Sequence, residues 1–512
     1  MHMQLIRSNQ IVMFDRTDFG RSNLSLPKGV CRHDPHDSSL VDDCTAHSIL
    51  YDIASNTFRP LFIRTDTWCS SGSVLPGGTL VQTGGYNDGD RVVRMISPCR
   101  HKFCDWSESS HYLLKRRWYA SNQILPDGRI IIVGGRRQFN YEFFPRNTRS
   151  SSPSSTISFS FLQETRDPEE NNLYPFLHLL PDGNLFVFAN TRAISLDYRR
   201  NRIVKEFPSI TRNDPRNYPS SGSSVLLPID DTHTNTNQNK CIKVEVMICG
   251  GAPRGAFGAA GHGHFTPSLT TCGRIQVMDK NPRWAMETMP IARVMGDMIL
   301  LPNLDVLIIN GAQSGTAGWN NAGNPATRPL LYKPESTLGN RFSILSRASR
   351  PRMYHSSAIL IPDGRVIVGG SNPHTFYNFS DVQYPTDLSL EAFSPPYLAA
   401  NQNPLRPRFI DCDEILVYKQ PFSLTFEVEN FQKAGIVSVV ILAPPFTTHS
   451  YGMNQRMVRL RVSSLTQGHS HTKHTMIVLG PSIPEIAPSG YYLLFVIHAE
   501  IPSSGLWVKV QQ

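Results

Sequence analysis

Short apolar runs that follow proline-containing turns dominate about the first 400 residues of this chain. The clearest runs are RIIIVGG at 129–135, VEVMICGG at 244–251 and RVIVGG at 365–370. Short runs rich in β-branched side chains that end in glycine predict the second strand of a β-hairpin. The turns carry prolines at 76, 126, 181, 228, 302 and 362, separated by 50, 55, 47, 74 and 60 residues. This spacing is near the roughly 50 residues of a kelch propeller blade and predicts one blade per turn.

The N-terminal stretch from Met1 to Arg16 has the same pattern. Ser8, Asn9 and Gln10 form its turn and IVMF is its second strand. This seventh unit predicts a seven-bladed kelch-type β-propeller. The position seven residues before the turn falls at or before residue 1, so we expect the sequence to begin inside its first strand, with a leader and the first residues of the mature protein missing.

The pattern changes after Ser394-Pro395-Pro396-Tyr397. From about residue 400, short strands follow one another without glycine doublets, as in FSLTFEV, IVSVVIL, RMVRLRV and YYLLFVI. Such strands predict a small immunoglobulin-like β-sandwich. The expected fold class is therefore all-β, with the propeller at 1–397 and the sandwich at 398–512.

Each turn also fixes an equivalent position upstream. Counting back seven residues from the six turn prolines leads to Cys69, Tyr119, Tyr174, Ser221, Met295 and His355. A radial repeat places equivalent positions around one axis, so a thiol, a phenol and an imidazole that are distant in sequence are expected to converge. Such a set predicts a redox metal site. Neighbours on a regular strand point to opposite faces, so the residue before His355 can face the same axis only if the backbone is irregular there.

Composition argues against a membrane-spanning chain and against a nucleic-acid-binding protein. Apolar residues make up 40% of the 512 positions, and no apolar run is long enough to cross a bilayer. The formal net charge of +9 is carried by scattered arginines that predict a solvated surface, among them Arg116, Arg117, Arg136, Arg137, Arg199 and Arg200. The same charge suits association with an anionic matrix such as cell-wall polysaccharide.

The cysteines indicate an oxidising compartment. There are nine, so eight remain for up to four disulfides if Cys69 is set aside. The sequence leaves the connectivity open, although two short separations suit local bridges: Cys31 to Cys44 and Cys99 to Cys104. Two sequons, at Asn23 and Asn378, agree with a secreted protein. The opening residues MHMQLIRSNQ contain no apolar segment of an export signal.

A series of motifs gives the chain a resemblance to a known group over essentially its whole length. They are Phe14-Asp15-Arg16-Thr17-Asp18, Thr67-Trp68-Cys69-Ser70-Ser71-Gly72, Arg117-Trp118-Tyr119-Ala120, Arg352-Met353-Tyr354-His355-Ser356, Thr447-Thr448-His449-Ser450 and Asn454-Gln455-Arg456. The chain resembles the galactose oxidase and glyoxal oxidase group of copper radical oxidases. Within that group it is most similar to the plant glyoxal oxidase-like aldehyde oxidases.

This resemblance implies a copper site with a protein-derived radical. Tyr119 would be the equatorial ligand, joined to Cys69 by a thioether bond and oxidised to a phenoxyl radical in the active enzyme. Tyr354 would be the axial ligand, and His355 and His449 the imidazole ligands, with one position open. Two imidazoles and phenolate oxygen in a tetragonal arrangement favour Cu(II). The metal and the radical together would take two electrons.

The implied reaction oxidises a small aldehyde, of the glyoxal or methylglyoxal type, to a carboxylic acid while O2 is reduced to H2O2. Tyr354 would accept the hydroxyl proton of the aldehyde hydrate, and the Tyr119 radical would abstract hydrogen from carbon. In galactose oxidases a tryptophan covers the cross-linked tyrosine, and the matching position here is Arg137. This difference disfavours galactose and leaves a primary alcohol on a cell-wall sugar as the alternative substrate. The resemblance further implies a secreted monomer of the cell wall or apoplast.

Other interpretations remain open. The chain could be a kelch-type binding or wall protein without the redox site, which would bind no copper and keep Cys69 and Tyr119 unlinked. Two further histidine groups have spacings that could hold zinc, namely His262 and His264 with Cys272, and His469, His471 and His474. Tyr174 and Met295 are expected either to line the pocket or to fill the propeller channel.

Overall fold

The computed structural model describes all residues of the chain except 99–103, 147–154, 233–241, 433–434 and 469. Regular structure in the described residues is almost entirely β, with two short α-helices, α1 (Ser160–Glu164) and α2 (Ala256–Gly261), and a few 3-10 turns. The predicted all-β class is confirmed. No helix in these residues is both long enough and apolar enough to span a bilayer.

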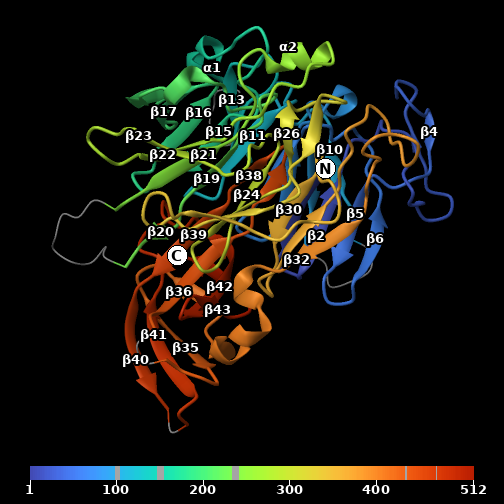
Figure 1. Ribbon diagram of the computed structural model, residues 1–512. Coiled ribbons are helices and arrows are strands. Elements are labelled where there is room, and N and C mark those ends of the chain that lie inside the picture. The colour runs from blue at the N-terminus through green and yellow to red at the C-terminus, as the bar shows by residue number, and fades with distance from the viewer. Residues whose placement is uncertain (99–103, 147–154, 233–241, 433–434, 469) are drawn as a thin grey trace.

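Small antiparallel sheets of consecutive strands form about the first 400 residues (Figure 1). Two of them begin the series: β1 (His2–Ile6), β2 (Gln10–Phe14), β5 (Ser48–Asp52) and β6 (Thr57–Leu61), then β7 (Ser71–Val74), β8 (Leu80–Thr83), β9 (Val93–Ile96) and β10 (Ser107–Ser109). Two more follow: β11 (Ala120–Ile124), β12 (Ile130–Gly134), β13 (Asn140–Phe144) and β14 (Ile157–Ser158), then β15 (Phe176–Leu179), β16 (Leu185–Ala189), β17 (Arg192–Asp197) and β18 (Arg202–Phe207).

The remaining sheets of this series continue the same order. They are β19 (Ser223–Leu226), β21 (Glu245–Cys249), β22 (Thr271–Gln276) and β23 (Trp284–Thr288), then β24 (Asp297–Leu300), β25 (Val306–Ile309), β28 (Leu330–Tyr332) and β29 (Phe342–Ile344), and lastly β30 (Ser357–Leu360), β31 (Val366–Gly369) and β32 (Leu390–Phe393). Two short ribbons lie between them: β3 (Arg32–His33) with β4 (Asp42–Asp43), and β26 (Ala312–Gly315) with β27 (Ala322–Pro325).

The predicted turns join the first two strands of their sheets. Between β7 and β8, Gly78 adopts φ +91° and its N–H donates to the Leu75 carbonyl at 2.8 Å. Gly128 and Gly364 repeat this geometry, with φ +81° and +91°. A side chain is strained at such positive φ, so glycine closes these hairpins tightly. The apolar second strands are buried on both faces, as in β12, which explains why they read as continuous apolar runs.

The C-terminal region forms two further sheets, drawn in orange and red below the small sheets in Figure 1. One contains β33 (Arg408–Cys412), β35 (Pro421–Glu427), β40 (Val462–Gln467) and β41 (Lys473–Leu479). The other contains β34 (Ile415–Val417), β36 (Val437–Ala443), β39 (Arg456–Leu460), β42 (Gly490–His498), β43 (Ile501–Pro502) and β44 (Leu506–Gln511), joined by β20 (Ile229–Asp230). The predicted C-terminal strands are therefore present.

A hairpin from this region enters the middle of the small sheets. Its strands are β37 (Phe446–Thr448) and β38 (Tyr451–Met453), and β37 pairs with β1. Between them, β37 and β38 contact the first strand of every sheet in the series: β1, β7, β11, β15, β19, β24 and β30. Figure 1 shows β38, in red, among strands from the first two thirds of the chain.

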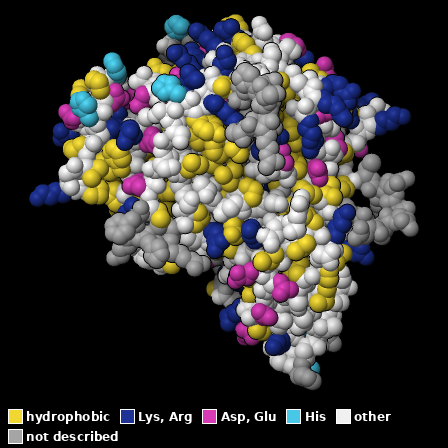
Figure 2. Space-filling model, turned by 180° about the vertical axis from the view of Figure 1, so that it is seen from behind, with side chains coloured by type: hydrophobic (Ala, Val, Ile, Leu, Met, Phe, Trp, Pro, Cys, Tyr) yellow, Lys and Arg dark blue, Asp and Glu magenta, His cyan; other side chains and the backbone are white. Residues whose placement is uncertain are grey.

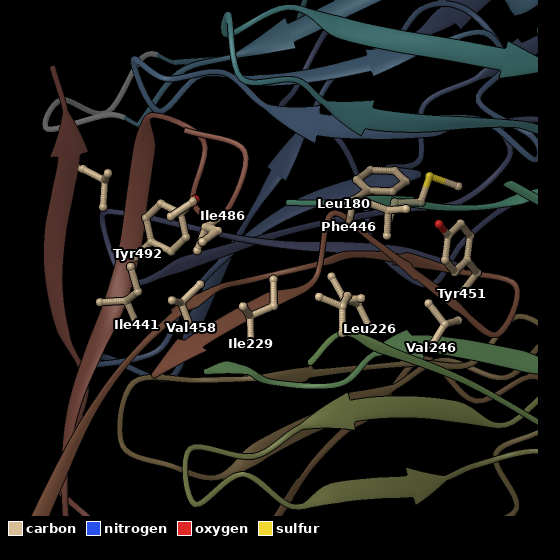
Figure 3. Packing of buried hydrophobic residues seen from close by; sticks show 14 of the residues in the cluster. Leu180, Leu226, Ile229, Val246, Ile441, Phe446, Tyr451, Val458, Ile486 and Tyr492 are labelled. Atoms are coloured by element: carbon tan, nitrogen blue, oxygen red, sulfur yellow. The ribbon is translucent and has the colours of Figure 1, made fainter. Parts of the chain in front are cut away.

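Buried aromatic side chains hold this hairpin in place. Phe446 and Tyr451 pack beside Leu226 and Val246 in the core (Figure 3). The Tyr451 hydroxyl donates to the Leu177 carbonyl at 2.7 Å. Glycine is required at position 72, because a Cβ there would overlap the Phe446 ring. The C-terminal region is thus locked into the sheets that precede it.

One of the arginines predicted to be solvated is fully buried. Arg117 has no exposed surface; its Nη1 donates to the Gly134 carbonyl at 2.6 Å and its Nη2 lies 2.7 Å from Glu142 Oε1. The prediction for Arg117 was wrong because its guanidinium is buried, where it pairs with Glu142 and donates a hydrogen bond to the carbonyl of Gly134 in a glycine doublet. The other five named arginines keep 40% or more of their side chains exposed, and Figure 2 shows Lys and Arg spread in several groups among Asp and Glu.

Two disulfides are formed in the described residues, Cys31 to Cys44 as the spacing suggested and Cys249 to Cys272 across β21 and β22. Cys104 is also disulfide-bonded, whereas Cys99 and Cys241 lie outside the described residues. Cys412 is a free thiol. The described residues therefore do not complete the four disulfides that eight cysteines would allow.

Candidate active site

The six equivalent positions identified from the turns share one backbone conformation. Each has a positive φ, between 45° and 64°, just before the first strand of its sheet: Cys69, Tyr119, Tyr174, Ser221, Met295 and His355. Side chains other than glycine seldom adopt this conformation, and it concentrates at functional sites. Backbone hydrogen bonds connect neighbouring positions: the Tyr119 N–H donates to the Cys69 carbonyl at 2.9 Å, and the Tyr174 N–H donates to the Tyr119 carbonyl at 3.0 Å. The six positions that are equivalent in the sequence therefore also have equivalent backbone conformations in the structure.

Tyr354 and His355 both face the same centre because the backbone before β30 is irregular, as the sequence required. The two rings lie 4.2 Å apart between centroids. His355 Nδ1 lies 3.2 Å from Asp15 Oδ1 and 3.3 Å from Oδ2. Burial lowers the pKa of His355 to about 4, although Asp15 acts in the opposite direction. The imidazole is thus neutral at ordinary pH, and a carboxylate fixes its orientation.

His449 occupies the tip of the β37–β38 hairpin. It and Ser450 form a two-residue loop in which both have positive φ, 45° and 67°. Turns of this kind normally use Asn-Gly, so His-Ser is a strained choice. His449 Nδ1 lies 2.6 Å from Thr448 Oγ1 and its Nε2 lies 3.2 Å from Cys69 Sγ. Burial lowers the pKa of His449 well below its ordinary value.

The hairpin brings His449 among the predicted site residues. Its ring centroid is 5.0 Å from that of His355, 5.7 Å from that of Tyr354 and 6.2 Å from that of Tyr119. Cys69 and Tyr119 are buried, and burial raises the pKa of both well above the ordinary values of a thiol and a phenol. All five residues named by the resemblance therefore converge, although they come from four distant parts of the chain.

Tyr218 is the main site residue that the sequence reasoning missed. The Tyr119 hydroxyl donates to the Tyr218 hydroxyl at 3.2 Å, and the Tyr218 and Tyr354 hydroxyls are 2.9 Å apart. Tyr218 thus joins the two phenols of the site in one hydrogen-bonded row. It lies three residues before Ser221, so a search around each equivalent position, rather than at it, would have found it.

The other three equivalent positions contribute less chemistry. Tyr174 lines the site: its ring is 5.1 Å from the His449 ring and its hydroxyl donates to the Ser70 carbonyl at 2.9 Å. Met295 packs in the same small cluster as Tyr354. Ser221 is buried, and its Oγ has no hydrogen-bond partner among the described residues. Tyr174 thus borders the candidate site, while Met295 packs beside Tyr354.

Trp118 packs against the Tyr119 ring, although Arg137 stands at the position that matches the tryptophan of galactose oxidases. The Trp118 ring centroid is 4.8 Å from that of Tyr119, and Trp68 lies 4.9 Å from Trp118. Trp319 stacks on Trp68 at 5.2 Å, and the Arg16 guanidinium lies 4.1 Å from the Trp68 ring. Arg137 is 66% exposed and pairs with an acidic side chain at the surface. The aromatic cover is supplied from motif positions next to Cys69 and Tyr119.

The donor set fits a copper ion. Two neutral imidazoles and two phenols converge, and His355 Nε2 is buried without a hydrogen-bond partner among the described residues. A histidine whose Nδ1 is held by a carboxylate and whose Nε2 has no partner is arranged as a metal ligand. Mixed nitrogen and oxygen donors of this type suit Cu(II), and a cation at the centre would reverse the raised phenol pKa values.

The alternative zinc groups are not assembled. Cys272 is in a disulfide, His262 is exposed and His469 lies outside the described residues. His474 packs its ring 3.9 Å from that of Phe431. No group of three or more His, Cys, Asp or Glu side chains placed to hold a metal exists in the part of the chain that the structure describes.

Comparison with known proteins identifies the family. The family model described as glyoxal oxidase N-terminus matches residues 1–397, and a galactose oxidase-like Early set domain matches residues 406–510. The chain belongs to the glyoxal oxidase family. Aldehyde oxidase GLOX of Vitis pseudoreticulata is 44% identical over 512 residues, which is 100% of this chain and 94% of that protein. Aldehyde oxidase GLOX1 of Arabidopsis thaliana is 42% identical over 98% of this chain and 81% of its own length.

A solved structure of the same fold exists at low sequence identity. A fungal alcohol oxidase of the AA5 family, described in complex with copper, superimposes with a TM-score of 0.73 at 16% identity, over 100% of this chain and 96% of its own. The glyoxal oxidase family member described here therefore shares its overall fold with that enzyme.

Proposed function

We propose that this protein is a copper radical oxidase that oxidises small aldehydes to carboxylic acids and reduces O2 to H2O2. The observation that supports it best is the convergence of Cys69, Tyr119, Tyr354, His355 and His449 at the tip of the β37–β38 hairpin. The plant relatives named aldehyde oxidase are 41 to 44% identical, whereas a galactose oxidase of Gibberella zeae is 23% identical. Aldehydes are therefore favoured over the primary alcohol of a sugar.

His355 and His449 would hold copper through Nε2, and Tyr119 and Tyr354 through their phenol oxygens. Bound copper would supply a one-electron couple and an open position for substrate. Tyr119, cross-linked to Cys69, would supply the second electron hole as a phenoxyl radical. Cys69 Sγ lies 3.2 Å from His449 Nε2, and Cys69 shares a buried cluster with Tyr119, as a thioether between the two would require.

The chain's own residues account for both hydrogens that leave the substrate. An aldehyde hydrate would lose a proton from oxygen to Tyr354 and a hydrogen atom from carbon to the Tyr119 radical, and the remaining electron would pass to the one-electron couple that copper would supply. Two protons and two electrons leave the substrate, and O2 takes up the same number to become H2O2. Burial of the phenols and the tryptophan cover exclude water from this step.

The proposal also includes the arrangement of the sheets, the location of the protein and its oligomeric state. The sheets beginning at β1, β7, β11, β15, β19, β24 and β30 would be seven kelch-type blades around the β37–β38 hairpin, with residues 398–512 as an immunoglobulin-like sandwich. The disulfides support a secreted, extracellular protein, in the cell wall or apoplast. Asn23 is exposed, as a glycan acceptor must be, whereas Asn378 is half-buried. We expect the protein to act as a monomer.

Copper loading tests the proposed function directly. The protein would be incubated with Cu(II) under air and then assayed with glyoxal, methylglyoxal and galactose for H2O2 release. We expect peroxide from both aldehydes, little from galactose, and a Cys69–Tyr119 peptide pair lighter by two hydrogens. An unlinked pair with no peroxide would instead favour the non-catalytic binding or wall protein.

Asp15 is expected to act through His355. In Asp15→Asn the charged partner of Nδ1 is lost, and copper affinity should fall by about 10 to 100-fold, as for other residues that orient a metal-binding histidine. Titration of the apoprotein with Cu(II) measures this. Asp363→Asn, at a surface turn, is the control and should leave the affinity unchanged. Equal affinities for Asp15→Asn and the wild type would contradict the role.

Tyr218 is expected to be a positioning residue for both phenols. In Tyr218→Phe, kcat should fall about tenfold with little change in KM, the effect of losing roughly 1.4 kcal/mol of hydrogen bonding in the transition state. Steady-state kinetics with glyoxal would show the split. Tyr332→Phe removes a buried hydroxyl bonded to Glu287 elsewhere, and should lower the melting temperature without changing kcat. A rise in KM alone for Tyr218→Phe would oppose this role.

A further inference from the structure

A surface cavity of about 370 Å³ lies on the outer side of the tryptophan that covers Tyr119. We call it the arginine pocket, and its principal lining residues are Tyr86, Asp90, Arg116, Trp118, Arg136 and Arg137. The Tyr86 and Trp118 rings are 4.5 Å apart, and the Trp118 and Tyr119 rings are 4.8 Å apart. A volume of this size accommodates a ligand of one or two rings. Whatever binds here is one aromatic ring away from the proposed radical.

The pocket carries a small positive charge. Arg136 and Arg137 share Glu170, through Nε contacts of 2.6 and 3.2 Å, while Arg116 pairs with Asp90 at 3.1 Å. Arg166 Nη2 also lies 3.8 Å from Glu170 Oε1, so four guanidiniums surround two carboxylates and positive charge is in excess at the pocket. No hydrogen bond from the Nη groups of Arg136 or Arg137 is found within the described part of the chain.

Aromatic and cationic groups alternate across the pocket. The Arg136 guanidinium lies 5.2 Å from the centre of the Trp118 ring. Arg116 and Arg137 are 77% and 66% exposed at its edge, and Tyr86 is 38% exposed. The pocket thus offers flat apolar faces to a ring and forked N–H donors to groups at the rim of that ring.

This combination matches a uronic acid residue. A pyranose ring has an apolar face that stacks on Tyr or Trp, and its single carboxylate is the group that arginine binds best through paired N–H donors. The excess of guanidiniums over carboxylates at the pocket favours a ligand that carries a carboxylate. A phosphate polymer is a poorer match, because its affinity comes from many unpaired cations that release counterions. The disulfides also indicate an extracellular setting without nucleic acid.

We propose that the arginine pocket binds a uronate residue of an acidic polysaccharide and so holds that polymer beside Trp118, the tryptophan that contacts Tyr119. The proposal goes beyond the oxidase function and does not depend on it, because binding requires neither the copper nor the radical. It gives a definite location to the general attraction between a +9 protein and an anionic matrix.

Titration calorimetry of the copper-loaded protein with hexagalacturonate tests the proposal. We expect binding that weakens as salt is raised and is absent with a neutral glucose oligomer of the same length. The double variant Arg116→Gln/Arg137→Gln should bind at least tenfold more weakly. Arg199→Gln/Arg200→Gln, which removes the same charge from exposed arginines elsewhere, is the matched control and should bind like the wild type.

Three results would overturn it: no binding of hexagalacturonate, an equal loss in both double variants, or equally tight binding of dextran sulfate or single-stranded DNA at this pocket. The last two would show only general attraction of polyanions. Peroxide release from glyoxal, measured on the same samples, separates this proposal from the oxidase. Retained binding by a protein that makes no peroxide would refute the oxidase function and support the pocket.

Discussion

Replacing Cys69 with alanine is expected to lower kcat/KM for glyoxal by about three orders of magnitude, as removal of a group that takes part in the chemistry does. The thiol is fully buried beside Tyr119 and His449, so no other residue can replace its bond to the ring. Without the proposed thioether, Tyr119 would be a plain phenol and harder to oxidise. Initial rates of peroxide formation by copper-loaded Cys69→Ala measure the loss.

The chain provides a matched control for this experiment. Cys412 is the other free thiol in the described residues and lies in β33, in the C-terminal sheets. Cys412→Ala should keep the wild-type rate and the two-hydrogen mass deficit of the Cys69–Tyr119 pair. Cys69→Ala should lose both while binding copper, because all four proposed ligands remain. If Cys69→Ala retained wild-type activity, the cross-linked radical would not be needed and the proposed chemistry would be wrong.

Replacing His449 with alanine is expected to abolish copper binding in the micromolar range and, with it, turnover. A residue that only orients a ligand is worth about 10 to 100-fold in metal affinity, so loss of a ligand itself should cost more. The fold should survive, because Phe446 and Tyr451 still anchor the hairpin. Copper content after dialysis, together with the melting temperature of the apoprotein, separates loss of the ligand from loss of the fold.

Ser450→Gly is the control for the strained turn. Glycine accepts the positive φ of 67° that serine holds there, so this variant should gain up to about 1 kcal/mol in stability and keep its copper. A His449→Ala protein that still bound copper tightly would remove the hairpin from the metal site. If His449→Ala bound no copper only because it had unfolded, its melting curve would show no transition.

Much of the fold could be predicted from the sequence because the repeat is written in local turn chemistry. Leu75-Pro76-Gly77-Gly78 and its copies specify hairpins through residues that few other backbones need. The same spacing located Cys69, Tyr119 and His355, because equivalent residues of a repeated unit adopt equivalent conformations. Strand pairing between β1 and β37 could not be read, since contacts between residues about 440 positions apart leave no local pattern.

Residues whose roles depend on neighbours distant in the sequence could not be identified from the sequence. Tyr218 lies off the repeat and acquires its role only from two other tyrosines. Arg117 looked like one more surface arginine until Glu142 and a glycine carbonyl proved to surround it. Arg116, Arg136 and Arg137 read as scattered charges, yet they meet around Trp118. The composition gives the number of such residues but not which side chains they contact.

The position of the β37–β38 hairpin also determines the order in which the parts of the candidate site can assemble. His449 is 380 residues beyond Cys69, and its hairpin can settle only between sheets whose strands have already formed. Domains fold largely in the order in which they are synthesised. The proposed copper ligand His449 therefore reaches the site after the sheets around it have formed, so an incomplete chain is expected to lack oxidase activity during synthesis.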